Sequence, residues 1–399
     1  MSHRTTPLLI RFLALLALAH LYVGLRLLGD LPLGGTSKAA AAAALAASCL
    51  LIPLGLLGRS GAGQGPRDAL AWAGLLAMGL FSSLFVLTLL RDVLLVLAQL
   101  AAWAGLAVPM AALRAQSAWA VPALAGLASL AGLFNARRRA AVVDIAVPVQ
   151  DLPAALHGYS IVQLSDIHVG PTIKRGYVQA IVDAANALAP DLIAVTGDVV
   201  DGSVRHLRAH TEALAGLRAR DGVYLVTGNH EYYSGVQQWV QEFRRLGLTV
   251  LMNEHAVLRR GGAVLVVAGV TDHGAGSFDR AQACDPARAL HGAPPEAAVR
   301  LLLAHQPRTA LQAQGLGYTL QLSGHTHGGQ FLPWGWFVRF QQPITAGLHR
   351  LGGLWVYVSR GTGYWGPPKR LGAPSEITRL RLVPATARPV RPGPSRDRP

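Results

Sequence analysis

The chain has 399 residues, a formal net charge of +15 and 51% hydrophobic residues. Its two cysteines, Cys49 and Cys284, exclude a disulfide-stapled scaffold. Residues 1–140 carry eleven of the 36 basic side chains, so the positive charge is split along the chain, which argues against a nucleic-acid partner. The composition changes near residue 140 from almost wholly apolar to that of an ordinary α/β domain.

The N-terminal part consists of apolar stretches long enough to cross a bilayer, which takes about 20 residues. They are residues 8–28, 39–57, 69–90, 93–113 and 118–134. Arg91 and Asp92 interrupt the run, so residues 93–113 either cross the membrane or lie along its surface. We expect an all-α transmembrane bundle of four or five helices over residues 1–139, in a multi-pass protein of the cell membrane. A cleaved signal peptide at residues 8–28 is disfavoured because further apolar stretches follow.

The basic residues outside these stretches indicate which side of the membrane each end occupies. Arg59, Arg67 and the run at 137–139 favour the cytoplasmic side. Four helices with a cytoplasmic N-terminus satisfy all of them and place the C-terminal part in the cytoplasm. Five helices would put either the N-terminus or the arginines at 137–139 outside.

Residues 140–385 alternate between short apolar runs and amphipathic segments. Strands are expected at residues 141–149, 159–164, 191–196, 223–227, 250–252, 256–259, 264–270, 300–304, 318–323, 355–359 and 377–383. Helices are expected at residues 175–188, 204–217 and 237–246. This order predicts two packed sheets with helices outside. The Pro- and Arg-rich tail, 386–399, is expected to be disordered.

Polar clusters follow five of the expected strands. The clearest is Gly-His-Thr-His-Gly-Gly-Gln at 324–330, where two imidazoles at i and i+2 share one side of an extended chain. The clusters are Asp166 and His168; Asp198; Asn229 and His230; His305; and His325 and His327. Each alone is commonly a turn or core residue, but five at successive strand ends favour one metal site. Carboxylate, imidazole and amide ligands suit Mn, Fe or Zn, and the absence of thiolate argues against a closed structural zinc site.

This series resembles the calcineurin-like metallophosphoesterase superfamily and, within it, the YkuE-like branch. The matching motifs are DxH at 166–168, GD at 197–198, GNHE at 228–231, a lone His305, GHTH at 324–327, SRGTG at 359–363 and PSEI at 374–377. The resemblance covers residues 140–385 and implies a two-sheet α/β/β/α sandwich. The apolar N-terminal part is similar in architecture to the membrane-attached members.

The resemblance also implies two divalent metal ions. One would be held by Asp166, His168, Asp198 and His327. The other would be held by Asp198, Asn229, His305 and His325. Asp198 would bridge the two ions, because a carboxylate can contact two cations and a neutral imidazole cannot. Such a pair clamps the charge of a phosphoester under attack and lowers the pKa of a bridging water.

Two further residues are candidates for catalysis. By the resemblance, His230 would lie beside the substrate phosphate and protonate the leaving oxygen or stabilise the transition state. Asp201 either orients His230, as a similarly spaced acid does in related phosphatases, or caps the helix that starts near Val204. Glu231 is expected to support the site rather than to react.

One departure from the family bears on the substrate. The protein serine/threonine phosphatases of the superfamily carry GDxVDRG, whereas Gly202 and Ser203 follow Asp201 here. A protein phosphatase is therefore disfavoured. The hypothesis is a membrane-anchored hydrolase of phosphodiester or pyrophosphate bonds, with a lipid-linked substrate among the candidates. The alternatives are a membrane sensor with a non-catalytic metal-binding domain and a nuclease of the same superfamily.

Aromatic and basic residues gather after the last metal motif. They are Trp334, Trp336 and Phe337, followed by Arg360, Tyr364, Trp365, Lys369 and Arg370. They are either an ordinary mixture of core and surface or an amphipathic lip that touches the bilayer and guides a lipid headgroup.

Overall fold

The computed structural model describes residues 5–60 and 66–385, which divide into two compact units. The first unit runs to Phe134 and also includes Gly366–Lys369; the second comprises Asn135–Trp365 and the chain from Arg370. The boundary thus precedes the predicted one after residue 139, because the last turn of the fourth helix groups with the second unit. The predicted tail at 386–399 lies outside the described residues.

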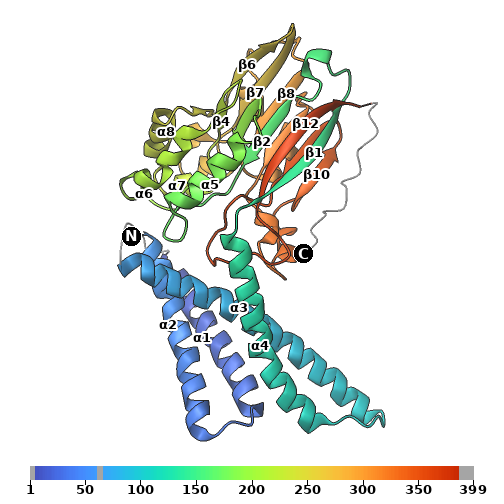
Figure 1. The fold of residues 1–399 in the computed structure, drawn as a ribbon. Coiled ribbons are helices and arrows are strands. Elements are labelled where there is room, and N and C mark those ends of the chain that lie inside the picture. The colour runs from blue at the N-terminus through green and yellow to red at the C-terminus, as the bar shows by residue number, and fades with distance from the viewer. Residues whose placement is uncertain (1–4, 61–65, 386–399) are drawn as a thin grey trace. The chain divides into compact units, whose positions relative to one another are not determined.

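Four helices form the described part of the first unit (Figure 1). They are α1 (Thr5–Asp30), α2 (Gly35–Ser60), α3 (Pro66–Trp103) and α4 (Met110–Arg137). All four are long and apolar enough to cross a membrane, which confirms the predicted bundle of four. A separate fifth segment at 93–113 is wrong, because residues 93–103 continue α3 and α4 begins at residue 110.

Helix α3 continues through Arg91 and Asp92 because neighbouring helices satisfy both charges. The Arg91 side chain is almost fully buried and donates hydrogen bonds to the Asp30 carboxylate and, over 2.8 Å, to the Ser117 hydroxyl. Asp92 accepts from Arg26 Nε at 2.8 Å and from the Tyr22 hydroxyl at 2.7 Å. Charged residues that break an isolated apolar run can therefore lie inside a helix when other helices supply their partners.

The second unit is built on two six-stranded sheets (Figure 1). The first has the order β1 (Ala141–Val149), β12 (Glu376–Pro384), β2 (Ser160–Leu164), β3 (Leu192–Val195), β4 (Val223–Leu225) and β5 (Thr249–Val250). The second has the order β10 (Gly347–Leu351), β11 (Leu354–Val358), β9 (Leu320–Ser323), β8 (Val299–Leu303), β7 (Ala263–Gly269) and β6 (Glu254–Arg260). Strand β10 had no counterpart among the expected strands.

Both faces of the first sheet are apolar, which explains why its strands read as continuous hydrophobic runs. Ile161 and Leu192 point into the core between the two sheets, whereas Val162 and Ile193 pack on the other side with the helices. Those helices are α5 (Arg175–Asn186), α6 (Val204–Thr211) and α8 (Val236–Arg245). Short helices α9 (Pro286–Ala289) and α10 (Ala310–Ala313) cover the second sheet. The predicted α/β/β/α sandwich is confirmed.

The strand order brings the five polar clusters to one end of the sandwich. Strands β2, β3 and β4 are adjacent and parallel in the first sheet, and β8 and β9 are adjacent and parallel in the second. Parallel neighbours end at the same edge of a sheet, where α/β folds place their ligands. The amide of Gln163 ties the two edges together, since its Nε2 donates to Thr196 Oγ1 at 2.8 Å and to the Ser323 carbonyl at 2.9 Å.

We expect Asp30→Asn to destabilise the helical unit, because the buried Arg91 guanidinium loses its nearest carboxylate and keeps only that of Asp92, whose Oδ1 is 3.8 Å from Arg91 Nη1. Loss of the partner of a buried polar group costs about 1–3 kcal/mol. Thermal unfolding of detergent-solubilised protein would measure the change. Asp183→Asn, at an exposed position, should have no comparable effect. The double variant Asp30→Leu/Arg91→Leu should recover part of the loss, because it removes both charges; wild-type stability in Asp30→Asn would contradict the assigned pairing.

Candidate metal centre

The predicted ligands converge in three overlapping groups, each with ligand atoms within 4.8 Å of one another. The groups are Asp166, His168 and His327; His168, Asp198 and His230; and Asp198, His305 and His325. The first and third groups contain six of the seven predicted ligands. They separate into the same two sets that the family resemblance would assign to two ions. The middle group shares His168 with the first and Asp198 with the third.

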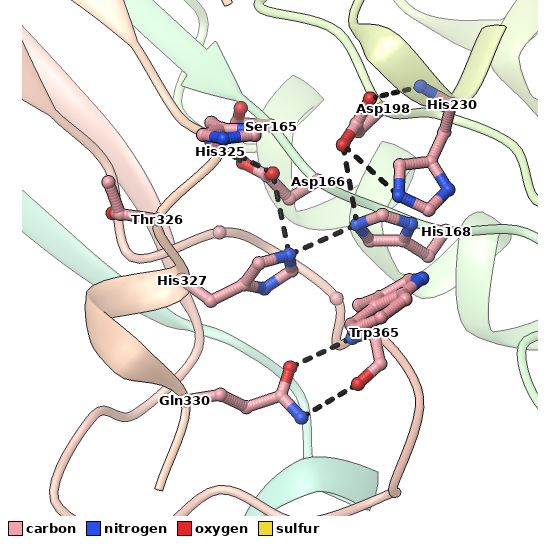
Figure 2. A network of polar contacts seen from close by, with 12 residues as sticks. Ser165, Asp166, His168, Asp198, His230, His325, Thr326, His327, Gln330 and Trp365 are labelled. Atoms are coloured by element: carbon pink, nitrogen blue, oxygen red, sulfur yellow. Dashed lines mark hydrogen bonds and ion pairs between the residues drawn. The ribbon is translucent and has the colours of Figure 1, made fainter. Parts of the chain in front are cut away.

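Two pairs of imidazole nitrogens face each other inside these groups, and Figure 2 shows the pair formed by His168 and His327. His168 Nε2 lies 3.0 Å from His327 Nε2, and His305 Nε2 lies 3.1 Å from His325 Nδ1. Two nitrogens bound at right angles to one ion, each at about 2.1 Å, are about 3.0 Å apart. Each pair therefore has the spacing of two neighbouring ligands on one cation.

Asp198 lies between the two histidine pairs. Its Oδ2 is 3.1 Å from His305 Nε2 and 3.9 Å from His168 Nε2, while its Oδ1 accepts the backbone N–H of His230 at 2.9 Å. Burial alone would raise the pKa of this carboxyl, but the imidazoles of His305, His230 and His168 hold its pKa below the usual range. The side chain is thus an ionised carboxylate in contact with both halves of the centre.

Asn229 supplies an acceptor of its own. Its side-chain Oδ1 is buried and has no hydrogen-bond partner among the residues that the structure describes. An unsatisfied buried carbonyl costs about 1–3 kcal/mol, so such groups are rare in native proteins. A divalent cation would satisfy this oxygen, which is consistent with the role expected of Asn229.

Five of the candidate ligands hold a backbone conformation that residues other than glycine seldom adopt. Positive φ angles between 51° and 70° occur at Asp166, His168, Asp198, His325 and His327. Each such residue costs of order 1–3 kcal/mol and persists only where the surroundings enforce it. Here the loops after β2 and β3 fix each other, because the Asp166 N–H donates to the Gly197 carbonyl and the His168 N–H donates to the Asp198 carbonyl.

Two motif glycines make room for the two carboxylates. A Cβ at Gly324 would lie 2.1 Å from Asp166 Oδ2, and a Cβ at Gly228 would lie 2.2 Å from Asp198 Oδ1. Any larger residue would therefore displace a ligand. The first glycine of GHTH and that of GNHE are explained by these contacts.

Glu231 holds the loop that carries Asp198. Its buried carboxylate accepts the backbone N–H groups of Val199 at 2.8 Å, Asp198 at 3.0 Å and Gly228 at 2.7 Å. Burial and the charge of Asp198 raise its pKa to about 7. The structure gives Glu231 the supporting position expected from the sequence.

The Asp201 carboxylate contacts two histidines. Its Oδ1 lies 2.5 Å from His230 Nδ1 and 3.1 Å from His168 Nδ1, whereas the N-cap of α6 is Ser203. Burial lowers the pKa of His230, but the charges of Asp198 and Asp201 outweigh it and raise that pKa to about 9. Of the two interpretations of Asp201, the geometry favours orientation of His230, and it adds a contact with His168 that the sequence did not suggest.

Two aromatic rings lie beside His230 and were not predicted from the sequence. The ring centroids of Tyr233 and Trp365 lie 5.3 Å and 5.7 Å from that of His230. Gln330, the last residue of the GHTHGGQ motif, fixes Trp365: its Nε2 donates to the Trp365 carbonyl and its Oε1 accepts the Trp365 N–H, both at 2.8 Å (Figure 2). The sequence showed Trp365 only as one of several aromatic and basic residues after the last metal motif. No local sequence pattern links it to His230, which lies 135 positions earlier.

Arg370 is a second residue whose place the sequence did not reveal. It is fully buried, and its Nη2 lies 3.1 Å from His327 Nδ1 while its Nη1 donates to the His327 carbonyl at 2.9 Å. A guanidinium with this many contacts fixes the position of the His327 loop.

A family model and several known proteins match the sequence of this chain. The sequence profile described as calcineurin-like phosphoesterase matches residues 159–329. A Danio rerio protein named "Transmembrane protein with metallophosphoesterase domain" is 40% identical over 63% of this chain and 59% of its own length. An uncharacterized metallophosphoesterase of Aquifex aeolicus is 33% identical over 54% of this chain and 82% of its own. The uncharacterized metallophosphoesterase YkuE of Bacillus subtilis is 31% identical over 58% of this chain and 81% of its own.

The matches differ in how much of each relative they cover. The chain spans about three fifths of the length of the fish relative and of a Bos taurus protein with the same name. By contrast, it covers about four fifths of each of the Aquifex and Bacillus proteins.

We expect Mn²⁺ to raise the unfolding temperature of the wild-type protein and not that of Asp198→Ala. A ligand at a hundredfold excess over its Kd stabilises the native state by about 2.7 kcal/mol. Thermal shift with and without Mn²⁺, together with elemental analysis of bound metal, would test this. Asp272→Asn is the matched control, since Asp272 is equally buried but belongs to none of the three groups. An equal Mn²⁺ shift in Asp198→Ala would contradict the central place given to this carboxylate.

Proposed function

Because this chain belongs to the calcineurin-like metallophosphoesterase family, we propose that it is a membrane-anchored hydrolase of phosphodiester or pyrophosphate bonds. The observation that carries the proposal is the arrangement around Asp198. Two histidine pairs with ligand spacing flank this carboxylate, and His230 faces the same centre while bonded to Asp201.

We propose that the centre holds two divalent ions, drawn from Mn, Fe and Zn. Asp166, His168 and His327 would bind one, and Asn229, His305 and His325 the other, with Asp198 contacting both. The unsatisfied Asn229 oxygen and the spacing of the imidazole pairs support this assignment. When bound, such ions neutralise phosphate oxygens and lower the pKa of water to near neutrality.

The residues around the ions have separate tasks in this proposal. His230 is only partly buried, so its ring can reach a substrate and protonate the leaving oxygen. Asp201 holds the His230 ring through Nδ1 and leaves Nε2 to face the reacting group. The same carboxylate contacts His168, so it fixes a proton donor and a metal ligand relative to each other.

We propose a lipid-linked substrate within this class. The support is the anchor, since an enzyme for a freely soluble ester gains nothing from four apolar helices. The names of the fish and cattle relatives also describe transmembrane proteins. The glycine, Gly202, that stands where the protein phosphatases carry their arginine favours a small phosphoester over a phosphoprotein.

The decisive test is turnover of a chromogenic phosphodiester, bis(p-nitrophenyl) phosphate, by detergent-purified protein loaded with Mn²⁺. Asp198→Ala should abolish turnover, and His230→Ala should lower kcat by about 10²–10⁴ while bound metal is retained, as is typical for loss of a general acid. His349→Ala changes an exposed histidine and serves as the control.

Three results would count against the proposal. Equal rates in wild type and Asp198→Ala would exclude hydrolysis at this centre. Bound metal without turnover of any phosphoester would favour the sensor alternative. Faster cleavage of single-stranded DNA than of a lipid pyrophosphate would favour the nuclease alternative.

We also propose that the second unit lies on the cytoplasmic side. If each of the four helices crosses the membrane once, Arg67 and the arginines at 137–139 would lie on one side, and the connections at 31–34 and 104–109, which hold no Lys or Arg, on the other. Basic residues concentrate on the cytoplasmic side of membrane proteins.

Protease accessibility tests this orientation. Trypsin added to inverted membrane vesicles should digest the second unit, and the same unit should be protected in intact spheroplasts. The reverse pattern would place the centre outside the cell.

A further inference from the structure

Large hydrophobic side chains are exposed in one short stretch of the second unit. Twelve such side chains are exposed among its described residues, and five of them fall within residues 332–340, here called the aromatic segment. The five are Leu332, Trp334, Trp336, Phe337 and Phe340. Phe340 is 79% exposed and Trp336 is 63% exposed, so these rings are surface features and not part of a core. The ordinary mixture of core and surface considered from the sequence does not describe this stretch.

The aromatic segment is fastened at its start to the loop that carries His327. Its short helix α11 (Gly335–Val338) packs against Gly329 so closely that a Cβ at Gly329 would lie 2.0 Å from the Gly335 Cα. Gly329, the last glycine of GHTHGG, thus allows the aromatic segment to pack directly on the loop that carries His327.

The chain just after the aromatic segment is fastened to the loop that carries His305. Gln342 is buried; its Nε2 donates to Gln306 Oε1 and its Oε1 accepts the Arg308 N–H, both at 3.1 Å. The aromatic rings are therefore held at a fixed position relative to two of the loops that form the metal centre.

The sequence on both sides of the aromatic segment contains basic residues and lacks acidic ones. Residues 297–375 contain seven Lys or Arg and no Asp or Glu. Arg339 lies within the aromatic segment and is exposed, and Arg308 donates to the Gln341 carbonyl at its end. Aromatic rings among basic residues are the composition of surfaces that enter the headgroup region of anionic membranes.

A short connection joins this unit to the last of the apolar helices. Helix α4 ends at Arg137 and β1 begins at Ala141, so three residues separate the last membrane helix from the first strand. At about 3.3–3.6 Å per residue, this connection spans no more than about 15 Å.

We infer that the aromatic segment inserts into the headgroup region of the bilayer and forms a second membrane contact, apart from the four helices. The partner is the lipid surface, preferably an anionic one. Trp336, Phe337 and Phe340 supply the apolar contact, and Arg339 meets lipid phosphate.

This contact has a consequence that rests on the proposed function. Because the aromatic segment is joined to the His305 and His327 loops, its insertion would hold the metal centre at a constant height above the bilayer. A phosphoester on a lipid headgroup would then reach the ions while its acyl chains stay in the membrane.

Spin labelling tests the contact without any need for turnover. In the full chain with Cys49→Ala and Cys284→Ala, a nitroxide is attached at Trp336→Cys or Phe340→Cys, and the protein is placed in phosphatidylcholine nanodiscs with or without phosphatidylglycerol. Collisions with oxygen should exceed those with a water-soluble nickel chelate, with a depth of about 5–10 Å. A label at Val257→Cys, an exposed apolar position on edge strand β6, should show the opposite preference.

Each other outcome overturns the inference. A label at 336 or 340 as accessible to the nickel chelate as the label at 257 would mean that the aromatic segment faces water. A strongly immobilised label shielded from both collision partners would mean that protein, such as a second copy of the chain, covers it. Because neither readout depends on catalysis, failure here would leave the proposed hydrolase standing, and an inactive enzyme would leave the membrane contact intact.

Discussion

The position of one ionised carboxylate, Asp198, determines how the metal centre is built. Its two oxygens have different partners: one accepts the backbone of His230, and the other faces imidazoles from both halves of the centre. A buried negative charge is tolerable only when positive charge and hydrogen-bond donors surround it. The imidazoles of His305, His230 and His168, the backbone N–H of His230 and the cations inferred here meet this requirement around Asp198.

The backbone of the ligand loops shows how the fold serves this requirement. Side chains leaving the ends of parallel strands would normally diverge to alternate sides. Left-handed turns at Asp166, Asp198 and His325 redirect the chain, so that side chains from two sheets point to a common centre. The strain in these turns is small beside the burial of a two-sheet core, in which each enclosed Leu or Ile contributes about 1.5–3 kcal/mol. The stable sandwich can therefore hold several unfavourable conformations at its edge.

Local patterns in the sequence were sufficient for the fold class and for the positions of the candidate ligands. Apolar runs that end in polar clusters predicted a parallel edge, and the structure brings those clusters together. What the sequence could not provide were contacts between distant segments. The charges at Arg91 and Asp92 looked like a helix break because their partners, Asp30 and Arg26, lie more than 60 residues earlier. Arg370 meets His327 across 43 positions, and no periodicity records that pairing.

The glutamine that ends the GHTHGGQ motif connects two parts of the site that are usually considered separately. The side-chain amide of Gln330 donates to the Trp365 carbonyl and accepts the Trp365 N–H, as a backbone amide does in a paired strand. Seven consecutive residues therefore contain two candidate metal ligands and the residue that orients Trp365. A relative that keeps both histidines but replaces this glutamine would keep the candidate metal ligands and lose the two hydrogen bonds that position Trp365.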